Sequence, residues 1–190
     1  MTVSHFQSSP REPKAKSAER RRIDVTITFL EQTERPSLAA PVRPKGKIAI
    51  LRAEKPPLHY YRYLYRLVGD PWKWVSRRKL NDADLAAIIH DPSVYVYTLI
   101  VNGAPAGIAE IDLRDHSVAE IKFFGLAPDM IGRGLGQFFL HNVIDLAWGL
   151  GPQTVQLETC TLDHPKALPL YQKFGFKVFD RRAGVVELAD

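Results

Sequence analysis

The sequence predicts one mixed α/β domain, and three observations lead to this prediction. The chain has 190 residues, of which 45% are hydrophobic, which suits one core and is too little for two ordinary domains. Segments with the two-residue period of strands are interspersed with segments that repeat at three and four residues, as helices do. Gly and Pro residues separate these segments. We therefore expect a single domain over residues 23–190, preceded by a disordered basic tail at 1–22.

The positive charge of the chain is concentrated at its N-terminus. The net charge is +5. Residues 1–22 carry six Lys or Arg side chains against two Glu, a net charge of +4, which leaves +1 for the rest. A basic segment rich in Ser and Pro is typical of a disordered extension. We therefore expect no specific nucleic-acid partner, although contact between the tail and an anionic partner stays an alternative.

The apolar stretches and the single cysteine bear on where the protein is located and on whether it can carry a disulfide or a metal cluster. The longest apolar stretches, around 94–101 and 138–150, are interrupted before the roughly 20 residues that a membrane crossing needs. The N-terminal charges are not followed by the apolar segment of a secretory signal. The lone Cys160 can form no intramolecular disulfide and excludes a Cys-based metal cluster. We expect a cytoplasmic protein without a membrane span or a metal site.

Strands and short helices are predicted in the first half of the chain. Alternating β-branched and polar residues indicate strands at 23–30 and 47–52, with a Pro-rich loop between them. Prolines mark the starts of two helical patterns, and Asn81 or Asp82 can cap a third. The predicted helices lie at 58–69, 72–80 and 82–91.

The second half of the chain begins with a predicted hairpin. Asn102 and Gly103 separate two segments of alternating apolar residues, 94–101 and 104–114. A glycine-rich turn after the next strand leads into an amphipathic helix. The remaining predicted elements are a strand at 118–126, helices at 135–150 and 165–174, and strands at 154–159, 176–179 and 185–188.

The turn between residues 126 and 136 has the composition of an anion site. Gly132, Gly134 and Gly136 alternate with larger residues, so backbone N–H groups at the start of the helix can approach an anion closely. The Walker and dinucleotide-binding patterns both fail, because the residues after Gly136 do not match them. Glycines that only make a tight turn remain the alternative for this segment taken by itself.

Two motifs in this part of the chain resemble those of the GCN5-related N-acetyltransferase (GNAT) family. The first is a strand that ends in Leu126, Ala127 and Pro128 and continues into the glycine loop at 131–136. Ile131 stands where the family usually has Arg or Gln. The second is similar to the family's N-x-x-A-x-x-x-Y-x-x-x-G-F segment, with His164 in place of Asn. Its matching residues are Ala167, Tyr171, Gly175 and Phe176.

The resemblance, which covers roughly 94–188, implies a fold and a co-substrate. The fold would be a GNAT-type mixed, mostly antiparallel sheet flanked by helices, with splayed central strands that form the cleft for acetyl-CoA. In the family, the backbone N–H at the position of Leu126 binds the cofactor, and the glycine loop holds its diphosphate. The implied cofactor-binding residues are Leu126, Ile131, Gly132, Arg133, Gly134, Leu135, Gly136, His164 and Ala167.

The resemblance also implies catalytic residues. Glu120 matches the position of the general-base glutamate, and Tyr171 matches the general acid near the cofactor sulfur. If the strand at 118–126 is regular, Glu120, Lys122, Phe124 and Leu126 share a face. An ion pair of Glu120 with Lys122, and a Tyr171 that only packs on its helix, are the alternatives. Glu110 ranks second as the base.

Acceptor-binding residues are sought in the first helices and on the neighbouring strand. Tyr61 and Trp72 belong to an aromatic run at the family's acceptor pocket, and Glu110 is a second acceptor-binding group. Core packing is the alternative for the aromatic residues. The predicted function is the transfer of an acetyl group to a primary amine in a ternary complex, and the alternative is a catalytically weak CoA-binding sensor. The sequence leaves the acceptor and the oligomeric state open, a homodimer included.

Overall fold

The computed structural model describes residues 21–188. Most of the predicted tail therefore lies outside the described residues, although Arg21 and Arg22 already belong to the first strand. Within 21–188, no helix combines the length and the hydropathy that a membrane crossing requires.

Seven strands form one sheet in the order β2-β3-β4-β5-β6-β1-β7. All neighbours pair antiparallel except β5 and β6, which run parallel. This arrangement confirms the predicted mixed, mostly antiparallel sheet. The strands are β1 Arg21–Gln32, β2 Ile48–Arg52, β3 Val94–Val101, β4 Ala104–Asp112, β5 Val118–Leu126, β6 Thr154–Cys160 and β7 Lys177–Leu188.

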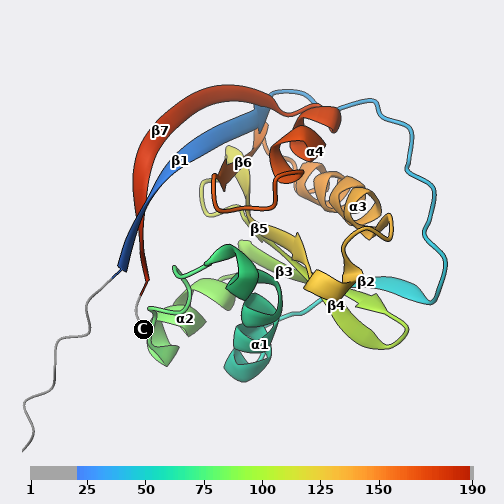
Figure 1. Cartoon of the computed structure of the whole chain (residues 1–190). Coiled ribbons are helices and arrows are strands. Elements are labelled where there is room, and N and C mark those ends of the chain that lie inside the picture. The colour runs from blue at the N-terminus through green and yellow to red at the C-terminus, as the bar shows by residue number, and fades with distance from the viewer. Residues whose placement is uncertain (1–20, 189–190) are drawn as a thin grey trace, which may run out of the picture.

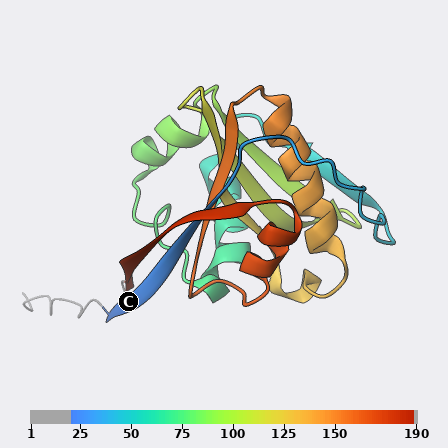
Figure 2. The same cartoon turned by 90° about the horizontal axis from the view of Figure 1, so that it is seen from above.

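Helices cover both faces of the sheet, as Figures 1 and 2 show. On one face α1 and α2 pack against β3 and β4 through a cluster that includes Leu64, Leu85 and Ile108. On the other face α3 lies against β5 and β6, and its buried Phe139 and Leu140 belong to the larger core. The helices are α1 Leu58–Gly69, α2 Asp82–Ile89, α3 Leu135–Gly149 and α4 Ala167–Lys173, with 3-10 turns η1 Asp70–Trp72 and η2 Pro128–Met130.

The predicted helix at 72–80 is wrong. Only the short turn η1 forms, and it ends because Lys73 adopts a left-handed backbone with φ of 60°. The following Trp74 turns back onto the end of α1, where a side chain larger than hydrogen at Gly69 would collide with its ring. Packing of Trp74 against Tyr65 and Phe123 thus replaces the expected helix with an irregular segment, 70–81.

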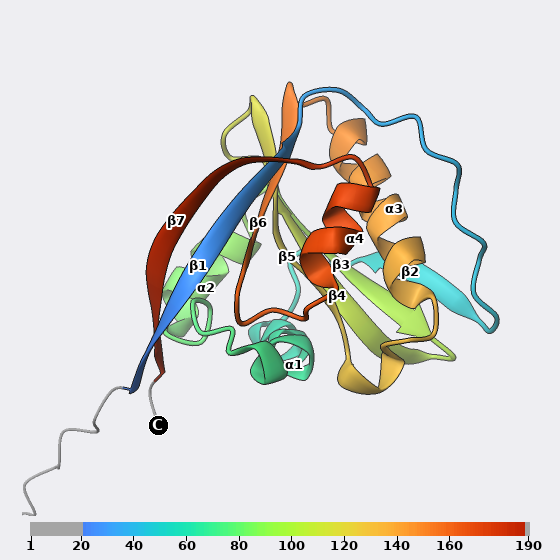
Figure 3. The ribbon, with the colours of Figure 1, turned by 45° about the horizontal axis from the view of Figure 1, so that its top comes forward.

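The two short C-terminal strands of the prediction are one long strand. β7 pairs with β1 from Lys177 to Leu188, through a single irregularity at Phe29 and Leu30. β6 pairs only with the second half of β1, from Ile27 onward. The first half of β1 and the end of β7 therefore form a two-stranded ribbon that extends beyond the sheet (Figure 3).

The central strands β5 and β6 diverge after a short stretch of pairing. Their register runs only from Val118 with Thr154 to Ile121 with Leu157. A bulge at Lys122 also interrupts the pairing of β5 with β4. Strand pairing therefore confirms the expected splay and produces an opening in the middle of the sheet.

Candidate active site

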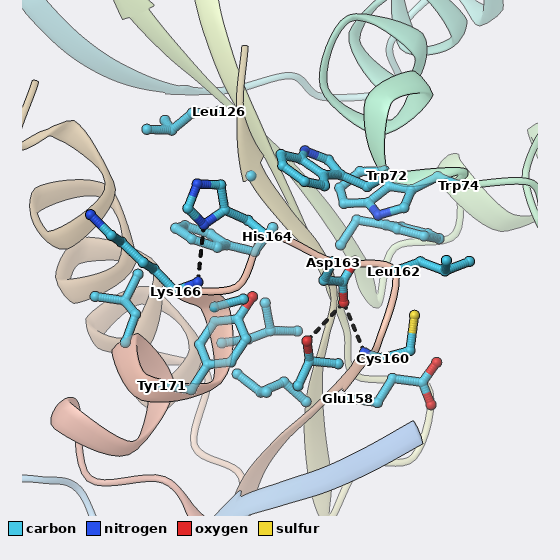
Figure 4. A pocket seen from close by; sticks show the side chains of 18 of the residues that line it. Trp72, Trp74, Leu126, Glu158, Cys160, Leu162, Asp163, His164, Lys166 and Tyr171 are labelled. Atoms are coloured by element: carbon cyan, nitrogen blue, oxygen red, sulfur yellow. Dashed lines mark hydrogen bonds between the residues drawn. The ribbon is translucent and has the colours of Figure 1, made fainter. Parts of the chain in front are cut away.

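A cleft of about 760 Å³ lies where β5 and β6 separate. Residues from the glycine loop, the start of α3, the 70–81 segment, α4 and the β1–β7 ribbon line it. Figure 4 shows how Trp72 and Trp74 on one side face His164, Asp163 and Tyr171 on the other. The cleft therefore connects both faces of the sheet through the gap between two strands.

The glycine loop forms one end of the cleft. Gly132 and Gly134 have φ of 84° and 77°, a left-handed backbone that favours glycine. Gly134 directly precedes α3, whose first turn has neither a side-chain cap nor an acidic residue. The free N–H groups of this 15-residue helix and its dipole therefore favour an anion.

Some of the predicted loop residues face the cleft and others do not. Ile131, Gly132, Gly134 and Gly136 line it. Leu135 is 3% exposed and packs in the core, so only its backbone can contact a ligand. Arg133 is exposed and does not line the cleft, and the structure does not place its charge at the site.

Leu126 presents a backbone donor to the gap. Ala127 N donates to Ala106 O at 2.9 Å, toward β4. Since N–H groups alternate in direction along a strand, the N–H of Leu126 points away from β4, to the side where β6 has departed. An extended amide-containing chain could pair with this strand edge as a missing strand would. The residues present thus fit the diphosphate and the amide arm of CoA.

Two lysines near α4 belong to the same end of the cleft. Lys166 and Lys173 both line it, and Lys173 Nζ donates to Gln137 Oε1 at 2.9 Å. Sequence reasoning missed both residues, although each flanks the second motif within five residues of Tyr171 or Ala167. Their charges add to the anion preference of the helix end.

His164 and Ala167, which belong to the second motif, both line the cleft. His164 Nδ1 accepts a hydrogen bond from the Lys166 N–H at 3.0 Å, which orders the turn before α4. The His164 ring lies 5.3 Å from that of Trp72, edge to face. This contact joins the 70–81 segment to the turn before α4 (Figure 4).

Tyr171 is held rigidly beside the gap. It is 8% exposed, and its ring lies 6.4 Å from Phe124 and 6.3 Å from Phe176. Its hydroxyl points into the cleft (Figure 4). Burial raises the pKa of Tyr171, and the negative charge of Asp163 raises it further. The phenol therefore keeps its proton at neutral pH and is available as a donor.

Glu120 does not line this cleft. It lines a separate polar pocket together with Asp112, Arg114 and Gln156. Its Oε1 accepts a hydrogen bond from Lys122 Nζ at 2.6 Å, which is the ion pair weighed as an alternative. The bulge at Lys122 also shifts the alternation, so that Glu120 no longer shares a face with Phe124 and Leu126.

Glu158 on β6 is a carboxylate that sequence reasoning did not assign to the site. Its side chain opens onto the cleft just beyond the last paired residue, Leu157. Desolvation raises the pKa of Glu158, the charges of Glu120 and Asp163 raise it further, and Lys122 opposes them. In the sequence, the one indication was that Glu158 lies on the strand that follows the glycine-loop helix. Other polar strand residues share this kind of position, and only the separation of β5 and β6 shows that Glu158 faces the cleft.

The predicted acceptor-binding residues separate into two groups. Trp72 lines the cleft. Tyr61 and Glu110 are both 0% exposed, and neither lines the cleft. Tyr61 donates to Glu110, which also forms an ion pair with Arg77. This buried network attaches α1 and the 70–81 segment to β4, so the placement does not support acceptor binding or base catalysis by Glu110 or Tyr61.

Residues 61–176, more than half of the chain, match the sequence model of the acetyltransferase (GNAT) family. The chain belongs to this family, which confirms the resemblance carried by the two motifs. No curated protein sequence matches the chain.

Solved structures with the same fold include three that their descriptions assign to this family. A GCN5-related N-acetyltransferase from Sphaerobacter thermophilus has 19% identity and a TM-score of 0.59, over 90% of this chain and 54% of that one. One from Kribbella flavida has 16% identity and a TM-score of 0.60, over 87% and 59%. A family member from Elizabethkingia anophelis with acetyl-CoA bound has 22% identity and a TM-score of 0.52, over 72% and 80%. The chain thus spans less than two thirds of the first two.

Proposed function

We propose that this protein is an N-acetyltransferase that moves an acetyl group from acetyl-CoA to a primary amine in a ternary complex. The observation that carries the proposal is the single cleft that joins the uncapped start of α3, the free edge of β5, the Tyr171 hydroxyl and the Glu158 carboxylate. The bound acetyl-CoA in the Elizabethkingia structure supports the choice of co-substrate.

The residues that would hold acetyl-CoA follow from the geometry of the cleft. The N–H groups of Gly134 and of the first turn of α3 bind the diphosphate, aided by Lys166 and Lys173. The N–H of Leu126 binds the amide arm in the gap between β5 and β6. Ala167 and His164 line the path at the start of α4. Acetyl-CoA supplies a thioester whose carbonyl carbon is attacked by the amine.

Acid and base roles fall to the two titratable groups whose surroundings suit them. Glu158 removes a proton from the acceptor ammonium, because its raised pKa brings it closer to the operating pH than an ordinary carboxyl. Tyr171 donates its proton to the departing thiolate as the carbon–sulfur bond breaks. Glu120, the base predicted from the resemblance, instead holds the Lys122 ammonium next to Glu158.

Calorimetry and a thiol-release assay, carried out one after the other, test this function. Titration with acetyl-CoA and with CoA should give a saturable heat, and addition of an amine should release free thiol in step with acetylated product. Saturable cofactor binding without thiol release from any amine would contradict catalysis and favour the CoA-binding sensor. Absence of cofactor binding would overturn both functions.

A further inference from the structure

The part of the cleft beyond Glu158 has apolar walls. β1 pairs Ile27 with Cys160, and paired residues present their side chains on the same face, which is also the face of Glu158 two residues away. Val25 and, through its pairing with Ile23, Val186 continue this face along the β1–β7 ribbon. The ribbon therefore supplies an aliphatic wall where an acceptor would approach the gap.

Aromatic rings form the opposite wall. Trp74 lines the cleft while its ring packs 5.1 Å from Phe123 and 5.4 Å from Tyr65, so its position is set by the core. Trp72 lies beside it and contacts His164 (Figure 4). Rigid ring faces of this kind suit a flat apolar group.

Two carboxylates line this end of the cleft, those of Glu158 and Asp163. Through Oδ2 alone, Asp163 accepts hydrogen bonds from the Thr159 hydroxyl at 2.7 Å and the Cys160 N–H at 2.9 Å. The Glu158 carboxylate makes no hydrogen bond or ion pair within residues 21–188. Lys73 also lines the cleft, and Lys122 lies near Glu158. Apart from these two carboxylates, a second ammonium group on an acceptor would meet apolar walls or like charges.

We infer that the acceptor is a monoamine with an apolar, ring-sized body, whose amino group is received by Glu158 and whose body lies between the tryptophans and the β1–β7 ribbon. This inference rests on the proposed function and specifies its substrate class. It excludes polyamines and aminoglycosides as preferred acceptors, because each additional ammonium that lay along the tryptophans or the ribbon would have to lose water without a carboxylate to replace it.

Initial rates of thiol release at saturating acetyl-CoA test the class. We expect kcat/KM for tryptamine and phenethylamine to exceed that for putrescine, spermidine and kanamycin by at least about 100-fold, because an unpaired ammonium that lies against apolar walls loses its hydration. A preference for any of the polycations, or rates within threefold of each other, would overturn the inference and leave the proposed function standing. No release from any amine would overturn the proposed function itself.

A charge introduced into the aliphatic wall provides a second test. Ile27→Glu should lower kcat/KM for phenethylamine by at least about tenfold and raise the relative rate with putrescine. Thr26→Glu is the matched control, because Thr26 is the next residue on the same strand, is exposed and does not line the cleft. Calorimetric binding of CoA by both variants shows that they fold. Equal effects of the two substitutions on phenethylamine would contradict the proposed position of the acceptor body.

Discussion

The Glu158 side chain is exposed to solvent in the cleft, and the protein around it still raises its pKa by removing part of its hydration. As the proposed base, Glu158 must lose its proton before it can accept another from the acceptor. Glu158→Gln should therefore lower kcat by about 10² to 10⁴-fold and remove the acid limb of the pH–rate profile. Glu120→Gln is the matched control and should retain most of the activity. The reverse order would return the base role to Glu120.

The raised pKa of Glu158 also has a consequence for stability. Below the ordinary carboxyl pKa both the folded and unfolded states bind this proton, so the group contributes nothing. As pH rises through the raised pKa, the folded state must hold a partly desolvated charge and loses a small part of its stability, because the side chain is still exposed. Glu158→Gln should therefore raise Tm at pH 7.5 and leave it nearly unchanged at pH 4. An equal rise at both pH values would mean that charge is not the cause.

The Tyr171 hydroxyl is the proposed proton donor, whereas the Tyr171 ring packs in the core. A substitution can separate these two contributions. Tyr171→Phe keeps the ring contacts with Phe124 and Phe176 and removes only the hydroxyl. We expect kcat to fall at least about tenfold, with the Kd for acetyl-CoA and the urea midpoint unchanged. Single-turnover rates and calorimetry measure the two effects. A parallel loss of cofactor affinity would assign Tyr171 a binding role.

At the scale of elements, the connection from β5 to α3 depends on backbone conformation more than on side chains. Gly134→Ala places a side chain on a left-handed residue next to the uncapped helix end, which costs about 1–2 kcal/mol or moves the loop. Either outcome should weaken CoA binding in calorimetry. Gly149→Ala at the other end of α3 is the control, because its φ is not positive and no atom lies within 4 Å of the added methyl. Equal CoA affinity in both variants would contradict backbone binding of the diphosphate.

The sequence correctly predicted those elements whose patterns depend only on residues that are close together in the chain. The Asn102–Gly103 turn, the glycine loop and the α3 periodicity each depend on neighbouring residues, and each is observed. The bulge at Lys122 depends on how β4 pairs with β5, and it reverses the face that a regular strand would give. The predicted helix at 72–80 failed because Trp74 packs against distant residues. Glu158 could not be assigned from the sequence either, because its place beside the cleft depends on where β5 and β6 separate.

At the scale of the whole molecule, residues 21–188 form two helical layers on a sheet that is open in the middle, so the α1–α2 layer needs contacts that fix it against β4. The buried network of Tyr61, Glu110 and Arg77 spans that boundary. Burial, together with the neighbouring Glu110 carboxylate, raises the pKa of Tyr61, so the phenol stays protonated as a donor. Because Trp72 and Trp74 follow α1 directly, this network also fixes the aromatic wall of the cleft.

Loss of the Arg77 charge should therefore lower the stability of the protein far more than loss of the Arg78 charge. Arg77→Met leaves Glu110 buried without its cation and should lower the free energy of unfolding by about 3–5 kcal/mol. Arg78→Met removes an exposed pair with Asp70 and should change it by less than about 1 kcal/mol. Urea denaturation measures both values. A small effect of Arg77→Met, with acceptor KM raised selectively, would show instead that Arg77 and Glu110 belong to the acceptor site after all.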